Sequence, residues 1–484
     1  MRYQMFKKKT SRMICLLLLV SMVSVILSSC GGKNEIEVYR TENELQGQAV
    51  WTMGFGRCEI PLPEDKSQPY YIAGYNSGWE PIGVLDLCNA QAVWMDAGAG
   101  GILLIGVDCV GLGRPTIQEI RNRLEDLCEE TGCTAVNVYS THDHAGVDTL
   151  GLWGPTMVDG KNDEYMENVI GAAVTAAYEA AENRTEGRLF YGSVDTEPLV
   201  PMLRDSRYPL IYDAYLHQLR FEPIDETTEG IRMYIYGAHA EALRGSNAKI
   251  SRDFPGAMCD MIEEETGDHA MFMPGAIGGL IMTKEFTVFA EENMLVTARK
   301  MTSFALSIEE EEEITPNLQY ARTEFEIPMD NTGYLFYKFL GILENEISKG
   351  DSATGYMLIS EMTVLQLGEL LFALIPGEIF PELVWGGEAA QHNPEGENPA
   401  ALAEIAAEVG YDRLLVIGLA NDELGYIVTP SDFLLNEDVP YLLKTMDDLG
   451  ENHYEETNSV GPQCAIVIAE IFEQLVNSLA LSSN

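Results

Sequence analysis

The chain has 484 residues, and its 76 acidic and 30 basic side chains give a formal net charge of −46. Such a charge repels phosphate groups, which excludes unspecific binding to nucleic acid and adhesion to anionic lipid through the protein surface. Hydrophobic residues make up 46% of the chain, which excludes global disorder and allows a substantial core.

The first thirty residues have the pattern of an export signal. A basic start over residues 2–12 precedes an apolar run over 13–27, which Leu-Ser-Ser-Cys30 closes. The apolar run is also long enough for a transmembrane anchor. However, Leu-Ser-Ser-Cys resembles a bacterial lipobox, in which the cysteine is acylated and becomes the first mature residue. We therefore predict a lipoprotein signal peptide at 1–29, a polar tether at 30–48, and an exported protein anchored to a membrane through Cys30.

Strand-like and helix-like stretches alternate from residue 49 to 484, without internal repeats or a long linker. The patterns predict strands at 92–96, 102–110, 135–140, 188–192, 232–238, 271–273, 370–375 and 414–417. They predict helices at 116–130, 163–182, 291–309, 334–346, 400–409 and 465–479. This alternation is typical of one large α/β domain with mixed β-sheets and flanking helices. Five glutamates at 309–313 predict a solvated surface element.

Seven cysteines remain beyond the first thirty residues: Cys58, Cys88, Cys109, Cys128, Cys133, Cys259 and Cys464. Their spacing matches no cysteine zinc ribbon. Cys128 and Cys133 flank a predicted helix end and could form a disulfide. Otherwise we interpret these residues as small, buried apolar side chains.

Two of the seven histidines stand together in the segment Thr141-His142-Asp143-His144-Ala145-Gly146. If the strand at 135–140 continues to this point, His142 and His144 face the same side and Asp143 points away. Such a pair can bind a metal or shuttle protons, although ordinary loop histidines have the same spacing. The His-x-His-x-Asp-His motif of metallo-β-lactamase-type hydrolases is disfavoured, because Gly146 and Val147 stand where that motif has Asp and His.

Other short sequence blocks lie before and after this histidine block, in a defined order along the chain. They are Ile82–Asp86 with Ala90–Met95, Tyr236–His239 with Ile250–Gly256, Ile375–Glu378, Gly418–Thr429, and Tyr454-Glu455 before Gly461-Pro462. Together they resemble the motifs of the neutral, non-lysosomal ceramidases, in the order found in that family. The resemblance extends over most of the chain, from the Ile82 block to Pro462, and implies one large neutral-ceramidase-like hydrolase domain at 49–484.

The resemblance implies a zinc site with four protein ligands. Carried over residue by residue, these ligands are His142, His239, Glu378 and Tyr426. Two imidazoles, a carboxylate and a phenol suit Zn²⁺, and an added water would complete the site. Each residue also has an ordinary structural interpretation: His239 as a core histidine, Glu378 as a carboxylate at a helix N-terminus, and Tyr426 as sheet packing.

Three more positions carry implied catalytic roles. His144 takes the place of a substrate-facing histidine that donates to the developing oxyanion. Tyr454 corresponds to a substrate-facing tyrosine. Arg204, in Leu203-Arg-Asp-Ser-Arg207, matches the family arginine, with Arg207 as the alternative.

The sequence departs from the family pattern at its essential serine. That serine lies in Gly-Asp-Val-Ser-Pro, whereas this chain has Pro274-Gly-Ala-Ile-Gly-Gly-Leu280, with Ala276 in place of the aspartate and Gly278 in place of the serine. A glycine cannot attack or hydrogen-bond through a side chain. The sequence also stops soon after Tyr454, so we expect no counterpart of the family's C-terminal immunoglobulin-like domain, and ceramide itself is not implied as the substrate.

The sequence therefore predicts a zinc-dependent hydrolase of an amide bond, with an ester as the other option, that uses zinc-activated water on an N-acyl lipid-like substrate. Two other hypotheses stay open. One is a catalytically inactive, envelope-anchored binding protein that retains the zinc pocket, which Gly278 motivates. The other is an ordinary envelope protein without a metal.

Overall fold

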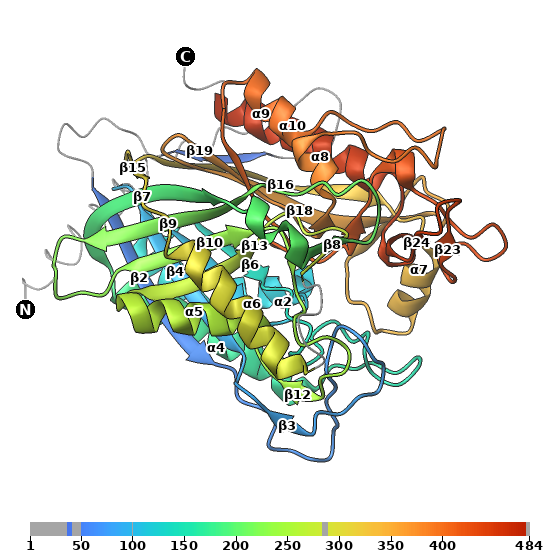
Figure 1. Cartoon of the computed structure of the whole chain (residues 1–484), viewed down its shortest axis with the longest axis horizontal. Helices are drawn as coiled ribbons and strands as arrows, with labels where there is room; N and C mark the ends of the chain where they lie inside the picture. The colour runs from blue at the N-terminus through green and yellow to red at the C-terminus, as the bar shows by residue number, and fades with distance from the viewer. Residues whose placement is uncertain (1–35, 41–49, 99, 283–288, 481–484) are drawn as a thin grey trace, which may run out of the picture.

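The computed structural model describes residues 36–40, 50–98, 100–282 and 289–480, and these form four layers. Two β-sheets pack face to face in the middle, and helices cover each outer face (Figure 1). The expected α/β architecture with mixed sheets and flanking helices is confirmed. Cys30, the predicted signal peptide and most of the predicted tether lie outside the described residues. No helix in the described part of the chain is long and apolar enough to span a bilayer.

The larger sheet has nine strands in the order β13-β10-β9-β7-β2-β4-β5-β6, with β15 paired to β7. Its strands are β2 (Trp51–Glu59), β4 (Asn89–Asp96), β5 (Ile102–Val107), β6 (Ala135–Ser140), β7 (Thr185–Asp195), β9 (Tyr215–Pro223), β10 (Ile231–Tyr236), β13 (His269–Pro274) and β15 (Glu311–Ile314). The β5–β6 and β10–β13 pairs are parallel. Tyr139 of β6 donates its hydroxyl to the carbonyl oxygen of Phe272 in β13 at 3.0 Å, so the two ends of this order meet.

The smaller sheet has the order β1-β16-β18-β19-β21, with β17 paired to β18. Its strands are β1 (Glu37–Arg40), β16 (Leu318–Pro328), β17 (Ile347–Lys349), β18 (Tyr356–Leu367), β19 (Leu370–Leu374) and β21 (Leu414–Ile417). Strand β19 is buried on both faces: Leu371 and Ala373 point to the outer helices, while Phe372 and Leu374 point to the larger sheet. Burial on both faces explains why this segment is a continuous apolar run.

Helix α4 (Asp163–Glu182) lies on the outer face of the larger sheet and begins at Asn162, whose side chain accepts from the backbone N–H of Tyr165. It approaches β2 closely, because glycines face it there. A Cβ at Gly56 would lie 2.1 Å from the carbonyl oxygen of Ala176. Helices α2 (Arg114–Arg123), α3 (Glu125–Thr131), α5 (Asp253–Thr266) and α6 (Ala290–Ala305) cover the rest of this side.

Helices α8 (Pro381–Trp385), α9 (Leu402–Glu408) and α10 (Cys464–Ala480) cover the outer face of the smaller sheet, at the top of Figure 1. The long helix α10 supplies the apolar face that packs on β16 and β18. The predicted helices at 400–409 and 465–479 are thereby confirmed to within two residues.

Two predicted helices are wrong in extent. The expected helix at 116–130 is split at Leu124, which has φ −99° and ψ 2° and separates α2 from α3. The expected helix at 334–346 is only α7 (Thr332–Phe339), because Gly341 takes a left-handed φ of 77° and its N–H binds the carbonyl oxygen of Lys338. The acidic run is exposed as predicted except at Glu311, which is half-buried and paired with Arg220, and residues 311–313 belong to strand β15.

The seven cysteines are free thiols in the structure. Cys88, Cys109, Cys259 and Cys464 are buried, as the interpretation of small apolar side chains predicts. Cys128 and Cys133 are half-buried and form no disulfide. The fold therefore holds together through its apolar layers without a disulfide among the described residues.

The close approach of α4 to β2 predicts opposite effects for two glycine substitutions. Gly56→Val places side-chain atoms against the backbone of α4, and we expect it to lower the free energy of unfolding by roughly 3 kcal/mol. Gly171→Ala, within α4 itself, meets no atom within 4 Å, and we expect it to raise stability by up to about 1 kcal/mol. Urea denaturation measures both, and equal stability of the two variants would contradict this packing.

Candidate functional site

The four predicted zinc ligands all follow the carboxyl ends of strands that have parallel partners. His142 follows β6 and His239 follows β10, both in the larger sheet. Glu378 follows β19 and Tyr426 follows β21, in the smaller sheet. In α/β proteins, ligand sites form outside the carboxyl ends of parallel strands. Here two packed sheets contribute to one such site.

Short strand pairs fix the position of three of these side chains. Strand β20 (Glu378–Ile379) pairs in parallel with β22 (Tyr426–Ile427), so that Glu378 lies directly opposite Tyr426. Strand β11 (His239–Ala240) pairs in parallel with β14 (Leu280–Met282). Directly opposed residues of a strand pair share a face, so the Glu378 and Tyr426 side chains point the same way.

His142 reaches the site through a strained turn instead of a continued strand. Strand β6 ends at Ser140, and His142 has a left-handed φ of 61°. Even so, Nε2 of His142 lies 3.1 Å from Nε2 of His144, and Asp143 points away into the protein, where its carboxylate accepts from the N–H of Ala145. The predicted convergence is therefore present, although its cause is the turn and not strand periodicity.

Backbone carbonyls set the tautomers of two histidines. Nδ1 of His142 lies 2.6 Å from the carbonyl oxygen of Val110, and Nδ1 of His239 lies 2.8 Å from that of Leu280. A carbonyl oxygen only accepts, so Nδ1 carries a proton in both rings and Nε2 is the nitrogen that faces the site. In His239, Nε2 also donates to Oε2 of Glu378, and a metal ion would replace that proton. Metal-binding histidines are typically held in this way.

The donor atoms lie within a few ångströms of one another. Oε2 of Glu378 lies 2.9 Å from Nε2 of His239 and 3.3 Å from Nε2 of His142. The Tyr426 hydroxyl lies 3.5 Å from Nε2 of His239. Zinc bonds of about 2.0–2.1 Å at tetrahedral angles separate neighbouring donors by about 3.3 Å. The structure thus brings all four predicted ligands together, at separations that a shared metal ion could bridge.

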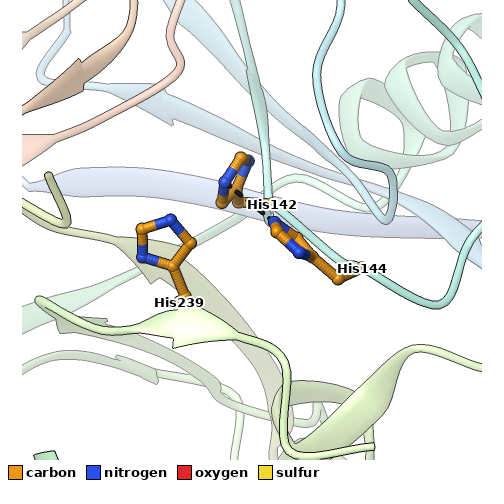
Figure 2. A group of neighbouring side chains, drawn as sticks. All are labelled: His142, His144 and His239. Carbon is orange, nitrogen blue, oxygen red and sulfur yellow. Dashed lines mark hydrogen bonds between the residues drawn. The ribbon is translucent and has the colours of Figure 1, made fainter. Parts of the chain in front are cut away.

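His144 lies at the edge of this donor set. Its ring centroid is 4.6 Å from that of His142 and 5.6 Å from that of His239, and the three rings converge in Figure 2. Burial, with His142 and His239 nearby, holds the pKa of His144 well below its usual range, so the ring is neutral. These three histidines alone form a group that could hold a metal ion. His144 is therefore close enough either to bind the ion or to contact a substrate.

The charges within the site favour a cation. Burial alone would raise the pKa of Glu378, but His142 and His239 hold it well below its usual range, so Glu378 is an anion. Burial alone would lower the pKa of His239, but Glu378 raises it to about 9. Burial, and then Glu378, raise the pKa of Tyr426 well above its usual range. One buried carboxylate thus dominates the electrostatics of the donor set.

The structure also defines the positions of Tyr454 and of the two candidate arginines. The Tyr454 hydroxyl lies 3.0 Å from that of Tyr426. Arg204, on β8 (Leu203–Asp205), is exposed and lines the cavity beside the donor set. The alternative, Arg207, is buried and bound to Asp432 at 2.9 Å and to Glu456 at 2.7 Å. The geometry therefore favours Arg204 over Arg207 as the arginine at the site.

A cavity of about 580 Å³ opens onto His142, His144, Glu378, Tyr426 and Tyr454. Its wall is rich in apolar and aromatic side chains: Leu150, Leu152, Trp153, Ile281, Tyr334, Tyr337, Leu343 and Leu358. Such a mixture of an apolar wall and converging polar groups is typical of a small-molecule site.

Two carboxylates at the site were absent from the sequence-based prediction. Glu241 accepts a hydrogen bond from the Tyr75 hydroxyl and lies 3.8 Å from Nδ1 of His144. Glu241 lies two residues after His239, directly beyond the end of β11, and this proximity was the signal available in the sequence. Glu423 also lines the cavity, and burial followed by the Glu378 charge raises its pKa well above the usual range. Glu423 therefore presents a neutral carboxyl group, and only its burial reveals that property.

Gly278 has no room for any side chain. A Cβ there would lie 2.7 Å from both the carbonyl carbon of Ile379 and the nitrogen of Phe380. The N–H of Gly278 also donates to the carbonyl oxygen of Ile379 at 2.9 Å, which fixes this approach. Position 278 therefore requires glycine, because β20 packs directly against this segment. A nucleophilic side chain cannot occupy the position in this backbone arrangement.

Comparison with known proteins identifies the fold. No family model matches the chain, and no curated protein matches it in sequence. Among solved structures, it is similar to a neutral ceramidase from Pseudomonas aeruginosa, with a TM-score of 0.68 and 15% identity over 90% of this chain and 75% of that chain. A ceramidase complexed with C2 gives a TM-score of 0.66 at 15% identity, over 89% of this chain and 75% of the other. The resemblance seen in the sequence is thus confirmed as a shared fold.

The contact at Gly278 predicts that a serine cannot simply be restored there. We expect Gly278→Ser to lower the free energy of unfolding by roughly 3 kcal/mol, because the new Cβ would overlap the backbone of β20. Gly83→Ser is a matched control, since a Cβ at Gly83 meets only a lysine methylene at 3.8 Å. Thermal and urea unfolding of both variants test the expectation, and a Gly278→Ser variant of unchanged stability would show that the packing is wrong.

Proposed function

We propose that the protein is a zinc-dependent hydrolase that cleaves an amide bond in an N-acyl lipid-like substrate. One observation carries the proposal: nitrogen and oxygen donors from His142, His239, Glu378 and Tyr426 meet at the end of an apolar cavity of about 580 Å³. The fold shared with neutral ceramidases supports the amide bond as the target.

The donor set defines what each ligand contributes. His142 and His239 are held in the ligating tautomer by backbone carbonyls, and Glu378 supplies the negative charge. When bound, zinc lowers the pKa of a coordinated water to about 7 and polarises a carbonyl group. Water chemistry of this kind needs no nucleophilic side chain, which makes it compatible with Gly278.

The other residues at the cavity bind and orient the substrate. The apolar wall, with Trp153, Leu150 and Leu343, suits an acyl chain, whose burial contributes about 25 cal/mol per Å² of apolar surface. Tyr454 and His144 lie beside the donor set, where a hydroxyl and a ring N–H can donate to a carbonyl oxygen that gains charge. Arg204 adds a positive charge at the wall of a strongly acidic protein.

A binding protein without turnover is the second candidate, and Gly278 favours it. The position that carries the essential serine in the family pattern has no space for a side chain. Such a protein would use the same pocket to hold an acylated ligand. Release of product separates the two candidates, because both predict metal and ligand binding.

We expect the purified protein with zinc to release fatty acid from at least one member of a panel of N-acyl compounds. His142→Gln removes a ligand and is expected to lower kcat/KM at least about 100-fold. His269→Gln is the matched control, since His269 lies outside the cavity and pairs with Glu229. Bound zinc is measured in the same samples. Zinc retention and ligand binding with no product from any amide or ester would favour the binding protein.

The lipobox-like start supports a further part of the proposal, namely export and lipid anchoring at Cys30. An anchor there would hold the cavity near a membrane that contains N-acyl lipids. We expect labelled palmitate to be incorporated during expression in bacteria, and Cys30→Ala to abolish the label and move the protein to the soluble fraction. A conventional transmembrane anchor would leave the Cys30→Ala protein in the membrane fraction without any label.

A further inference from the structure

A second group of side chains with metal-binding character lies apart from the cavity. It consists of His392, Asp447 and His453. Strands β23 (Thr445–Met446) and β24 (Asn452–His453) form an antiparallel pair, and Asp447 follows β23. His392 comes from the segment between α8 and α9. Nε2 of His392 lies 3.3 Å from Oδ2 of Asp447, and Nε2 of His453 lies 3.8 Å from the same oxygen.

Two of the converging atoms are buried without a partner. The side chains of Asp447 and His453 are both 0% exposed. Within the described part of the chain, neither Oδ2 of Asp447 nor Nε2 of His453 has a hydrogen-bond partner. Their separation of 3.8 Å is too long for a hydrogen bond. Buried polar atoms are almost always satisfied, so this pair indicates an unseen ion or water between them.

The outer nitrogens of both histidines are bound by carboxylates. Nδ1 of His392 lies 2.6 Å from Oδ1 of Asp432, and Nδ1 of His453 lies 2.9 Å from Oε1 of Glu456. A carboxylate accepts, so each Nδ1 carries a proton, and Nε2 is the nitrogen of each ring that could bind a cation at the centre of the group. Carboxylate–histidine–metal arrangements have this form. Arg207 donates to both outer carboxylates and offsets part of their charge.

We propose that His392, Asp447 and His453 form a second, structural site for a divalent ion of the zinc class. Two imidazoles and one carboxylate favour zinc over magnesium or calcium, which prefer all-oxygen sites. The 3.3 Å and 3.8 Å separations are close to the roughly 3.3 Å between donors on a tetrahedral zinc ion. Asp448, whose side chain is 85% exposed and lies 3.4 Å from Nε2 of His392, or a water completes the fourth position.

The ion would fasten two segments that carry little regular structure. It joins the loop around His392 to the β23–β24 hairpin, and His453 immediately precedes Tyr454 at the cavity. The second ion therefore stabilises the hairpin and holds Tyr454 in place. This inference rests on the geometry of the group and is independent of the proposed hydrolase activity.

Cobalt provides the test, because tetrahedral Co²⁺ has a strong visible absorption and can replace zinc. The protein is stripped of metal and titrated with Co²⁺ alone. We expect the His142→Gln variant, whose first site has lost one ligand, to keep about one tetrahedral Co²⁺ per chain at the second site. Adding Asp447→Asn or His392→Gln to that variant is expected to weaken this binding at least about 100-fold. Adding His269→Gln instead is the control and should change nothing.

Unfolding temperature gives a second readout that does not depend on the added substitutions. Zn²⁺ should raise the unfolding temperature of the His142→Gln protein and protect the backbone amides of residues 445–453 from hydrogen exchange. Absence of tetrahedral Co²⁺ and of both zinc effects in folded His142→Gln protein would overturn the proposal. Failure of the hydrolase proposal would leave these results unchanged.

Discussion

Packing of the two sheets face to face is the constraint on which the site depends. The interface between them is apolar, with Phe372 and Leu374 of the smaller sheet against Ile235 and Met273 of the larger one. Since the parallel strands of both sheets end at the same edge, the chain leaves each of them toward a common space. Side chains placed shortly after these strand ends therefore lie close together without any additional structural element. Loss of this interface would separate the histidines from Glu378.

Turns with left-handed backbone conformations position several side chains near the site. His142, Leu419 and Asn421 have φ values of 61°, 49° and 66° and lie just beyond strand ends. Such conformations cost about 1–3 kcal/mol each and persist only where the surroundings determine them. Asn421 shows how: its side chain accepts from the N–H of Val138 and donates to Asn137, so the turn is bound to β6. Strain is concentrated where side chains must converge.

Buried charge links the cavity to the second histidine group. Arg207 lies among Asp432, Glu455 and Glu456, and the last two directly follow Tyr454. Removing either partner of a buried ion pair typically lowers the free energy of unfolding by about 3–5 kcal/mol. This network therefore holds its members in one arrangement. Arg207 therefore has a structural role, although it lies only three positions from Arg204 at the cavity. The protein as a whole has a net charge of −46. The same network orients both outer carboxylates of the histidine group.

The sequence alone predicted those helices and strands whose residue pattern is complete within a short stretch of the chain. Helix α4 and strands β6 and β21 have the predicted bounds, because their periodicity, capping residue or apolar run needs no distant partner. Strands β2, β9, β16 and β18 were missed, although the side chains of β16 and β18 contribute to both cores that flank the smaller sheet. The ordered motifs, through the family resemblance, indicated the fold and four residues that do meet.

Tertiary structure alone decided the rest, and the physical reason is packing over long sequence distances. Whether Gly278 can bear a side chain depends on the backbone of β20, and whether Arg204 or Arg207 faces the cavity depends on carboxylates from another part of the chain. His392 comes from a loop and His453 from a two-residue strand, and neither segment has a periodic pattern, so their convergence has no local signature. Sequence encodes which side chains are present and what each stretch prefers, whereas their proximity is set by how the sheets and loops pack.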